Sequence, residues 1–382
     1  MVRIKCTEDF QEMGAVIKVV GLGGAGGNAI NRMVEAGVRG VELIAANTDN
    51  QVLSRTRGDV RIQLGETVTR GRGVGMDPAK GRLAAEESKE ALREVMRGAD
   101  MIFITTGMGG GTGTGAAPLA AQIARECSAL TVGVVSRPFS FEGHARAQIA
   151  DAGIKELREC VDSLLVIPND RLLETSDEST PHAEAYRRAD DVLRQSVQAI
   201  SDVITHSGDI NMDMADIKAI MTNAGEALMG VGEASGPHRA EIAAKAAIES
   251  PLLENVTIDG AKGLIVNIVG RSSDHVTMHE VNEVMALIGP AMSREAKMKI
   301  GLASDPSLGD RLRVTVIATG FPASRARGAR PISRLVRGPA VTPISGPVQP
   351  ERAFNPLDRG RRDGGQDLSK PAYLRVKVRK LR

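Results

Sequence analysis

Two glycine-rich loops are the segments of this chain best suited to binding chemistry. Gly21–Gly26 (GLGGAG) and Gly107–Gly115 (GMGGGTGTG) each follow a short apolar run and precede a helical pattern. Glycine lets a backbone approach an oxyanion closely, and a helix that begins after such a loop offers unpaired N–H groups. The first loop alone is a weak match to the dinucleotide fingerprint. The second has six glycines in nine residues, which indicates backbone amides wrapped around phosphate oxygens.

A third glycine loop, Thr69–Gly75 (TRGRGVG), could close over the distal phosphate. No segment matches the Walker phosphate loop, in which a lysine and a serine or threonine follow the last glycine. A Rossmann dehydrogenase would use one glycine loop and an acid closing the second strand, where this chain has Asn47–Asp49. A dinucleotide oxidoreductase therefore stays open as an alternative, but it leaves two loops unexplained.

Two pairs of charged residues have a spacing that fits a catalytic or binding site but is equally common on the surface of an ordinary helix. Asp213 and Asp216 lie three residues apart at the start of a predicted helix, where acids are favoured by the helix dipole. Glu142 and Arg146 lie four apart, as in a solvated helical ion pair. Taken alone, each pair is better explained by its helix than by catalysis.

The elements that must position these residues alternate between strands and helices. Short apolar runs predict strands at 16–22, 40–46, 101–105, 130–135 and 163–167, with helices at 28–35, 80–97 and 113–127. This alternation is typical of a parallel sheet covered on both faces, a doubly wound α/β fold. A long helix is predicted at 189–205, and the remaining helices (240–248, 276–288) and strands (263–269, 311–318) predict a smaller α+β domain.

The composition excludes several classes of protein. The 382 residues carry 49 Lys and Arg against 47 Asp and Glu, and the apolar runs are too short to span a bilayer. The start of the chain lacks the apolar stretch of a signal peptide, and three scattered cysteines fit reduced thiols in a cytosol. Residues 325–382 have a local charge of +11, which leaves −9 for the first 324. We therefore expect an acidic globular body with a disordered basic tail.

The second glycine loop resembles the signature loop of the tubulin superfamily, in the form found in the FtsZ family of bacterial cell-division GTPases. The resemblance extends from about Val16 to Gly320. It also rests on the segments GGAGGN (23–28), NTD (47–49), RPFSFEGHAR (137–146), PNDRL (168–172), GDINMDMAD (208–216) and GEALMGVG (225–232). Val74 and Met76 stand where the family usually has small residues, which could alter how the γ-phosphate is sensed.

The resemblance implies a GTPase (GTP and water to GDP and phosphate) with a definite set of residues. It assigns GTP contacts to Gly24, Ala25, Gly26, Gly27 and Asn28, and to Gly109, Gly110, Gly111, Thr112, Gly113, Thr114 and Gly115. It assigns Glu142 and Arg146 to ribose and phosphate, and Asn28, Asn169 and Asp190 to the guanine edge. Tyr186 falls where a family phenylalanine stacks on the base. Asn211, Asp213 and Asp216 would position the attacking water from a neighbouring subunit, and Mg²⁺ would arrive with the nucleotide, with no metal site of the protein's own.

The resemblance also implies an organisation and partners. It gives an N-terminal extension (1–14), a GTP-binding domain (15–185), a core helix with the catalytic loop (186–224), the α+β domain (225–321), a disordered linker (322–366) and a partner-binding peptide (367–382). The chain would polymerise head to tail in the cytoplasm, at the mid-cell division ring on the inner face of the membrane. Asp367–Arg375 would bind membrane-tethering division proteins, and the basic tip would attract lipid weakly. Regulators of ring placement are further expected partners, and nucleic acid is not. A plasmid-segregating filament protein of the same superfamily stays an alternative.

Overall fold

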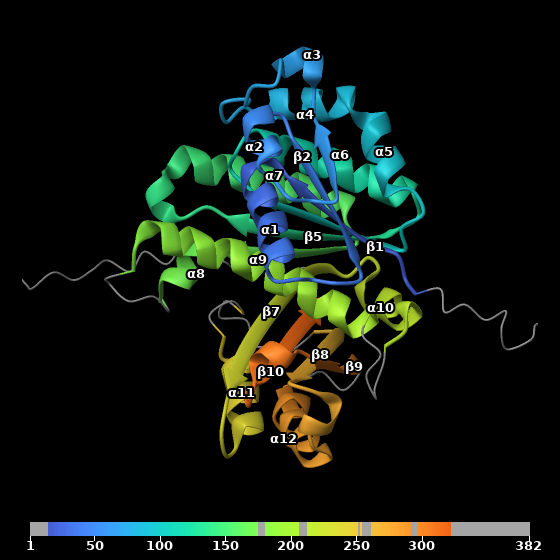
Figure 1. Cartoon of the computed structure of the whole chain (residues 1–382), viewed down its shortest axis with the longest axis vertical. Helices are drawn as coiled ribbons and strands as arrows, with labels where there is room; N and C mark the ends of the chain where they lie inside the picture. The colour runs from blue at the N-terminus through green and yellow to red at the C-terminus, as the bar shows by residue number, and fades with distance from the viewer. Residues whose placement is uncertain are drawn as a thin grey trace, which may run out of the picture. The chain divides into compact units, whose positions relative to one another are not determined.

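The strands of this protein are built mostly from uninterrupted apolar runs, as strands covered on both faces require. The computed structural model describes residues 14–174, 180–205, 212–250, 253, 261–291 and 296–321. The strands of these residues form one sheet in the order β3-β2-β1-β4-β5-β6-β7-β10-β8-β9 (Figure 1). Their bounds are β1 Ile17–Leu22, β2 Val41–Asn47, β3 Val60–Gln63, β4 Met101–Gly107, β5 Leu130–Arg137, β6 Ser163–Pro168, β7 Gly225–Ala234, β8 Gly263–Gly270, β9 Lys297–Ser304 and β10 Leu312–Thr319.

The strands from β3 to β6 are all parallel and have the doubly wound order that the sequence predicted. Helices cover both faces of this part of the sheet. The helices before the second half of the sheet are α1 Gly23–Glu35, α2 Asn50–Ser54, α3 Glu66–Thr69, α4 Pro78–Glu87, α5 Lys89–Met96, α6 Thr112–Glu126, α7 His144–Cys160, α8 Asn169–Glu174, α9 His182–Thr205 and α10 Met214–Met221. The apolar sides of α1 and α9 share one core, and those of α4 to α7 share the other.

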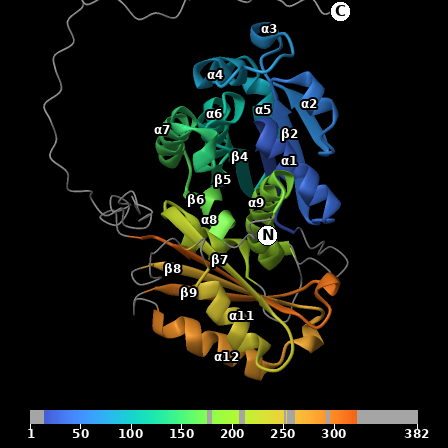
Figure 2. The ribbon, with the colours of Figure 1, turned by 90° about the vertical axis from the view of Figure 1, so that its left-hand side faces the viewer.

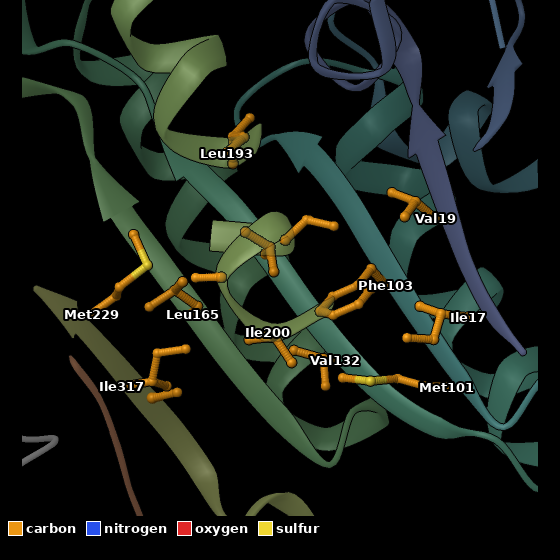
Figure 3. Packing of buried hydrophobic residues seen from close by; sticks show 14 of the residues in the cluster. Ile17, Val19, Met101, Phe103, Val132, Leu165, Leu193, Ile200, Met229 and Ile317 are labelled. Atoms are coloured by element: carbon orange, nitrogen blue, oxygen red, sulfur yellow. The ribbon is translucent and has the colours of Figure 1, made fainter. Parts of the chain in front are cut away.

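The long helix α9 joins the two halves of the fold. Its Leu193 and Ile200 pack with Phe103 and Val132 of the parallel strands, and Ile317 of β10 belongs to the same cluster (Figure 3). The side-chain amide of Asn267 in β8 donates a hydrogen bond to the Ala199 carbonyl at 3.2 Å. The core is therefore continuous through α9, and the expected central helix is confirmed.

The second half of the sheet is joined to the first by β7, which pairs with β6 over only three residues and runs antiparallel beside β10. Helices α11 (Arg239–Ile248) and α12 (Met278–Ile288) cover the face away from α9 (Figure 2). A Cβ at Gly230 or Gly232 would lie 2.0 Å from a carbonyl oxygen of α11. These two glycines of the GEALMGVG segment thus have a packing role, because they let α11 approach the strand.

Three element boundaries differ from the sequence predictions. The expected helix at 80–97 is two helices that meet at Ser88, whose backbone leaves the helical conformation (φ −99°, ψ 16°) while its hydroxyl accepts a hydrogen bond from the Gly65 amide. Helix α1 starts at Gly23, five residues early, so the glycine run forms its first turn. Helix α9 starts at His182, where polar residues had hidden the periodicity. Helix α7, strands β3, β7 and β9 and the short helices α2, α3 and α8 were not predicted.

Several predictions concern residues outside those that the structure describes. They are the segments 1–13, 322–366 and 367–382 and the residue Asn211. Among the described helices, none combines the length and the apolar character that crossing a bilayer requires.

Candidate functional site

Two helix N-termini meet at the carboxyl ends of neighbouring strands β1 and β4. Helix α1 follows β1 directly and packs on one face of the sheet, while α6 follows β4 and packs on the other. The chain order reverses between these strands, which is where doubly wound sheets bind ligands. Neither helix has a side-chain cap at its N-terminus. Their first N–H groups and the positive ends of their dipoles are therefore available to an anion.

The glycines of the two loops divide into a packing group and an open group. A Cβ at Gly113 would lie 2.0 Å from Thr106 Oγ1, and one at Gly115 would lie 2.0 Å from the Pro78 carbonyl oxygen. By contrast, a Cβ at Gly24 or Gly110 would have no neighbour within 4 Å. Much of the glycine content therefore serves the close packing of α6, and the space for a ligand lies at Gly24 and Gly110.

Hydrogen bonds hold the second glycine loop in shape. The amide of Gly109 donates to Thr114 Oγ1 at 2.9 Å, and the hydroxyls of Thr112 and Thr48 lie 2.8 Å apart. Thr48 follows β2, so the loop is tied to the strand on the far side of β1. A phosphate-binding loop needs such a fixed backbone, because its donors must be in place before the ligand arrives.

The third glycine loop lies against the second. The Val74 side chain is 7% exposed, and its Cγ2 would be 2.4 Å from a Cβ at Gly111. The Asn50 amide donates to the Gly71 carbonyl at 3.1 Å, so the loop is also attached to α2. Met76 has a φ of 64°, a left-handed conformation that is strained for methionine. The role of this loop over a distal phosphate stays a prediction.

Glu142 and Arg146 form an ion pair beside the second glycine loop, where a Cβ at Gly109 would lie 2.8 Å from Arg146 Cγ. Arg146 Nη1 lies 2.8 Å from Glu142 Oε2, and the side chain of Glu142 is only 7% exposed. The Phe139 amide donates to the other oxygen of Glu142 at 2.9 Å. Among the described residues, Arg146 Nε is buried without a hydrogen-bond partner. The Arg146 side chain is 39% exposed, so the buried Glu142 carboxylate and the unmatched Nε donor are what separate this pair from the solvated surface pair that its spacing alone indicated.

Aromatic rings adjoin this ion pair. Phe141 stacks on Phe139 with ring centroids 5.0 Å apart, and Tyr186 meets Phe139 edge-on at 5.3 Å. Burial raises the pKa of Tyr186, and the neighbouring Glu142 carboxylate raises it further. The phenol ring of Tyr186 is flat and 40% of the residue is exposed, so it could stack on a base.

A pocket of about 330 Å³ opens between α1 and α9. Its lining consists of Asn28, Asn31, Arg32, Glu35, Ala183, Tyr186, Arg187 and Asp190. Burial raises the pKa of Asp190 to about 7, although the charge of Arg32 and a hydrogen bond from Asn28 both oppose that shift. The pocket therefore offers a carboxylate and an amide side by side, which can match the donors and acceptor of a guanine edge.

Asn169 lies outside the lining of this pocket, at the carboxyl end of β6. Its side chain is buried, and its Oδ1 has no hydrogen-bond partner within the described part of the chain. A buried amide oxygen without a partner is costly. The atom fits a site that a ligand with N–H donors completes.

The acidic pair lies far from the glycine loops, toward the opposite end of the parallel strands. Asp213 caps α10 by accepting the Asp216 amide at 2.7 Å. The far end of α10 is fixed where β6 begins, since the Ser163 hydroxyl donates to the Met221 carbonyl at 2.7 Å. The glycine loops follow the carboxyl ends of the parallel strands, so one copy of the chain does not bring the acids and the loops together.

Two family models match the chain. The model of the Tubulin/FtsZ family GTPase domain matches residues 16–177, and that of the FtsZ family C-terminal domain matches residues 225–322. The chain is 42% identical to an FtsZ of M. jannaschii, described as an empty dimer, over 81% of this chain and 89% of that one, with a TM-score of 0.78. The chain belongs to the FtsZ family. It carries the family's GTPase domain and is accordingly a GTPase that binds guanine nucleotide.

Two more distant structures share the fold of this FtsZ-family protein. They are CetZ1 of Haloferax volcanii, described as a GDP-bound monomer, and CetZ2 of the same organism, described as a GTPγS-bound protofilament. Each covers 81% of this chain with a TM-score of 0.69, at 19% and 18% identity, and this chain covers 95% and 94% of their lengths. The dinucleotide oxidoreductase finds no support in these comparisons.

Sequence reasoning missed two cationic side chains, Arg32 and Lys299, which the fold places beside Asp190 and Asp216. Arg32 lies beside Asp190, and its spacing of four residues from Asn28 on α1 is a signal that could have identified it. Lys299 contacts Asp216 from β9, a strand that was not predicted. No sequence signal connects that lysine with an acid some eighty residues earlier.

Proposed function

We propose that copies of this chain stack head to tail into filaments and hydrolyse GTP at the junction between copies. The observation that carries this proposal is the position of Asp213 and Asp216, which lie toward the opposite end of the strands from the glycine loops. The span from Asp190 to Val203 on α9 alone amounts to roughly 20 Å. Acids held so far from the nucleotide can act on it only if a second copy supplies them.

Within one copy, the nucleotide would lie across the ends of α1 and α6. Gly24–Asn28 and Gly109–Gly115 would hold the phosphates through backbone amides, with open space at Gly24 and Gly110. The Glu142–Arg146 pair would contact ribose and phosphate. Mg²⁺ would accompany the phosphates and offset their charge.

The base would enter the pocket between α1 and α9. Asp190 would accept the N1–H and exocyclic amine of guanine, with Asn28 and Asn169 completing the edge contacts and Tyr186 stacking on the ring. Adenine would present an acceptor to the same carboxylate, so the pocket would favour guanine.

The second copy would contribute Asn211, Asp213 and Asp216, whose polar groups would orient the attacking water. Phosphoryl transfer makes few covalent demands on a protein and depends on an aligned nucleophile. Supplying that alignment from a neighbour would make hydrolysis depend on assembly. The protofilament described for CetZ2 and the dimer described for the M. jannaschii protein support association of this kind.

In the cell, such filaments would form the division ring at mid-cell, in the cytoplasm along the inner face of the membrane. Asp367–Arg375 would bind a membrane-tethering division protein, and the basic residues after it would add weak attraction to anionic lipid. Regulators of ring placement would act on the same polymer.

A mixture of two inactive variants tests the shared site. Asp213→Asn keeps the helix cap but removes the charge, and Gly110→Asp places a charge against the phosphates. Each protein alone should hydrolyse almost no GTP. A 1:1 mixture should recover about a quarter of the parental rate, because one junction in four then joins an intact pocket to intact acids.

Energy transfer between labelled copies would verify that mixed filaments form. A binding assay would verify that Asp213→Asn still takes up GTP. Mixed filaments without any recovered hydrolysis would contradict the shared site.

A further inference from the structure

Lys299 contacts Asp216, one of the two proposed catalytic acids in the described part of the chain. Its Nζ lies 2.6 Å from Asp216 Oδ1, and the two side chains are 43% and 31% exposed. Ion pairs with this much solvent access add little to folding stability. A stabilising role therefore does not explain why the chain places a lysine there.

The backbone that carries Lys299 is firmly packed. It belongs to β9, the last strand of the sheet, which pairs with β8 along its length. Gly301, two residues on, lies so close to α9 that a Cβ there would be 3.0 Å from Val203 Cγ1 and 3.4 Å from Met212 Cε. Met212 is buried and directly precedes Asp213. Close packing of Gly301 against Val203 and Met212 thus connects the strand of the lysine to the segment that carries the acids.

The two acids already differ in their contacts within one copy. Asp213 accepts the Asp216 amide through Oδ1 and is tied to its own helix. Asp216 is held through Oδ1 by a side chain from another element. On docking against a second copy, both carboxylates would approach a triphosphate, where their charges oppose association. A lysine in contact with one of them reduces that repulsion and restricts its rotation.

We propose that Lys299 is a positioning residue of the junction: it holds Asp216 through Oδ1, leaves Oδ2 to orient the water, and offsets the charge that Asp216 brings to the neighbour's phosphates. This inference rests on the proposed function, in which Asp216 acts on the nucleotide of the next copy. Lys299 acts through Asp216 and does not itself touch the nucleotide of its own copy.

The test compares three substitutions on β9. Lys299→Met keeps the unbranched side chain to Cε and removes the charged group, and Lys299→Arg restores a cation. Lys297→Met is the matched control, because Lys297 is exposed and lies on the same face of the strand. We expect Lys299→Met to lower GTP hydrolysis per assembled subunit roughly 10- to 100-fold, since misplacing one group costs about that much. The affinity of the monomer for GTP should change less than about twofold, because the nucleotide pocket lies toward the opposite end of the strands and far from Lys299.

Lys299→Arg should recover most of the rate, and Lys297→Met should retain it. The deciding measurement is single-turnover hydrolysis with Lys299→Met placed in an Asp216→Asn background. If the lysine acts through the acid, its removal should change nothing further there.

The outcomes separate this inference from the proposed function. If Asp216→Asn loses hydrolysis while Lys299→Met retains the parental rate, the role of Lys299 is refuted and the shared site stands. If Lys299→Met costs the same factor with and without Asp216, the lysine does not act through that acid, which also refutes the inference. If Asp216→Asn itself hydrolyses GTP at the parental rate in filaments, the proposed function fails as well.

Discussion

The raised pKa of Asp190 predicts that GTP affinity depends on pH near neutrality. Burial sets this pKa at about 7 in the nucleotide-free protein, against an ordinary value of 3.8. In the proposed contact, guanine would donate two hydrogen bonds to the carboxylate, so binding would favour the ionised form. The affinity for GTP should therefore reach its full value well above pH 7 and fall as the pH drops through 7. The carboxyl is about nine-tenths ionised at pH 8 and about one-tenth at pH 6, which corresponds to a roughly tenfold loss of affinity.

The perturbation that isolates this effect is Asp190→Asn. Hydrogen bonds to a charged group contribute about 1.5–3 kcal/mol, so the variant should bind GTP roughly 10- to 100-fold more weakly at pH 8. At pH 6, where the parent is mostly protonated, that difference should shrink about tenfold. Equilibrium binding of a fluorescent GTP analogue to unassembled protein, at pH 6, 7 and 8, measures both constants. The phosphates of the nucleotide also titrate in this range, but they do so for both proteins and cancel in the ratio.

Asp191 offers a matched control on the same helix. Burial would raise its pKa, but hydrogen bonds from Arg194 and Gln195 outweigh burial and lower it. Asp191→Asn should therefore leave the pH dependence of binding unchanged. A ratio of parental to Asp190→Asn affinity that stays constant from pH 6 to pH 8 would refute the assignment of Asp190 to the base.

Three further predictions follow from the packing and the split site. Gly110→Ala should keep its thermal midpoint but bind GTP more weakly, because its Cβ would enter the space proposed for the ligand. Gly113→Ala should lower the free energy of unfolding by about 1–3 kcal/mol, because its Cβ would lie 2.0 Å from Thr106 Oγ1. Calorimetry and nucleotide binding check both variants, and equal thermal midpoints would contradict the division of the glycines into a packing group and an open group. GTP turnover per molecule should rise with protein concentration, and Asp213→Asn should still bind GTP and form longer-lived filaments; phosphate release that is independent of concentration would count against the shared site. Deleting Asp367–Arg382 should leave hydrolysis within about twofold while abolishing co-sedimentation with tether-coated vesicles, and truncated filaments that still pellet with them would argue against the tail as the attachment.

The local features of this protein could be predicted from the sequence. Apolar runs such as 16–22 and 101–105 are strands in the structure, because strands buried on both faces must be apolar along their length. The glycine loops indicated an anion site because only glycine lets a backbone approach so closely. The parallel doubly wound order followed from the alternation of strands and helices, and the motifs of the loops identified the family.

Only the tertiary structure could decide what the charged residues face. Glu142 and Arg146 have the spacing of a solvated pair, and only the structure shows that the Glu142 side chain is buried and lies near the aromatic cluster of Tyr186. Asp190 acquires its raised pKa from burial between α1 and α9, which no local pattern encodes. The contact of Lys299 with Asp216 joins segments far apart in sequence, and only the placement of β9 beside β8 brings the lysine to the acid. Local patterns follow from short-range sterics and solvation, whereas burial and charge contacts depend on which distant segments the sheet order brings together.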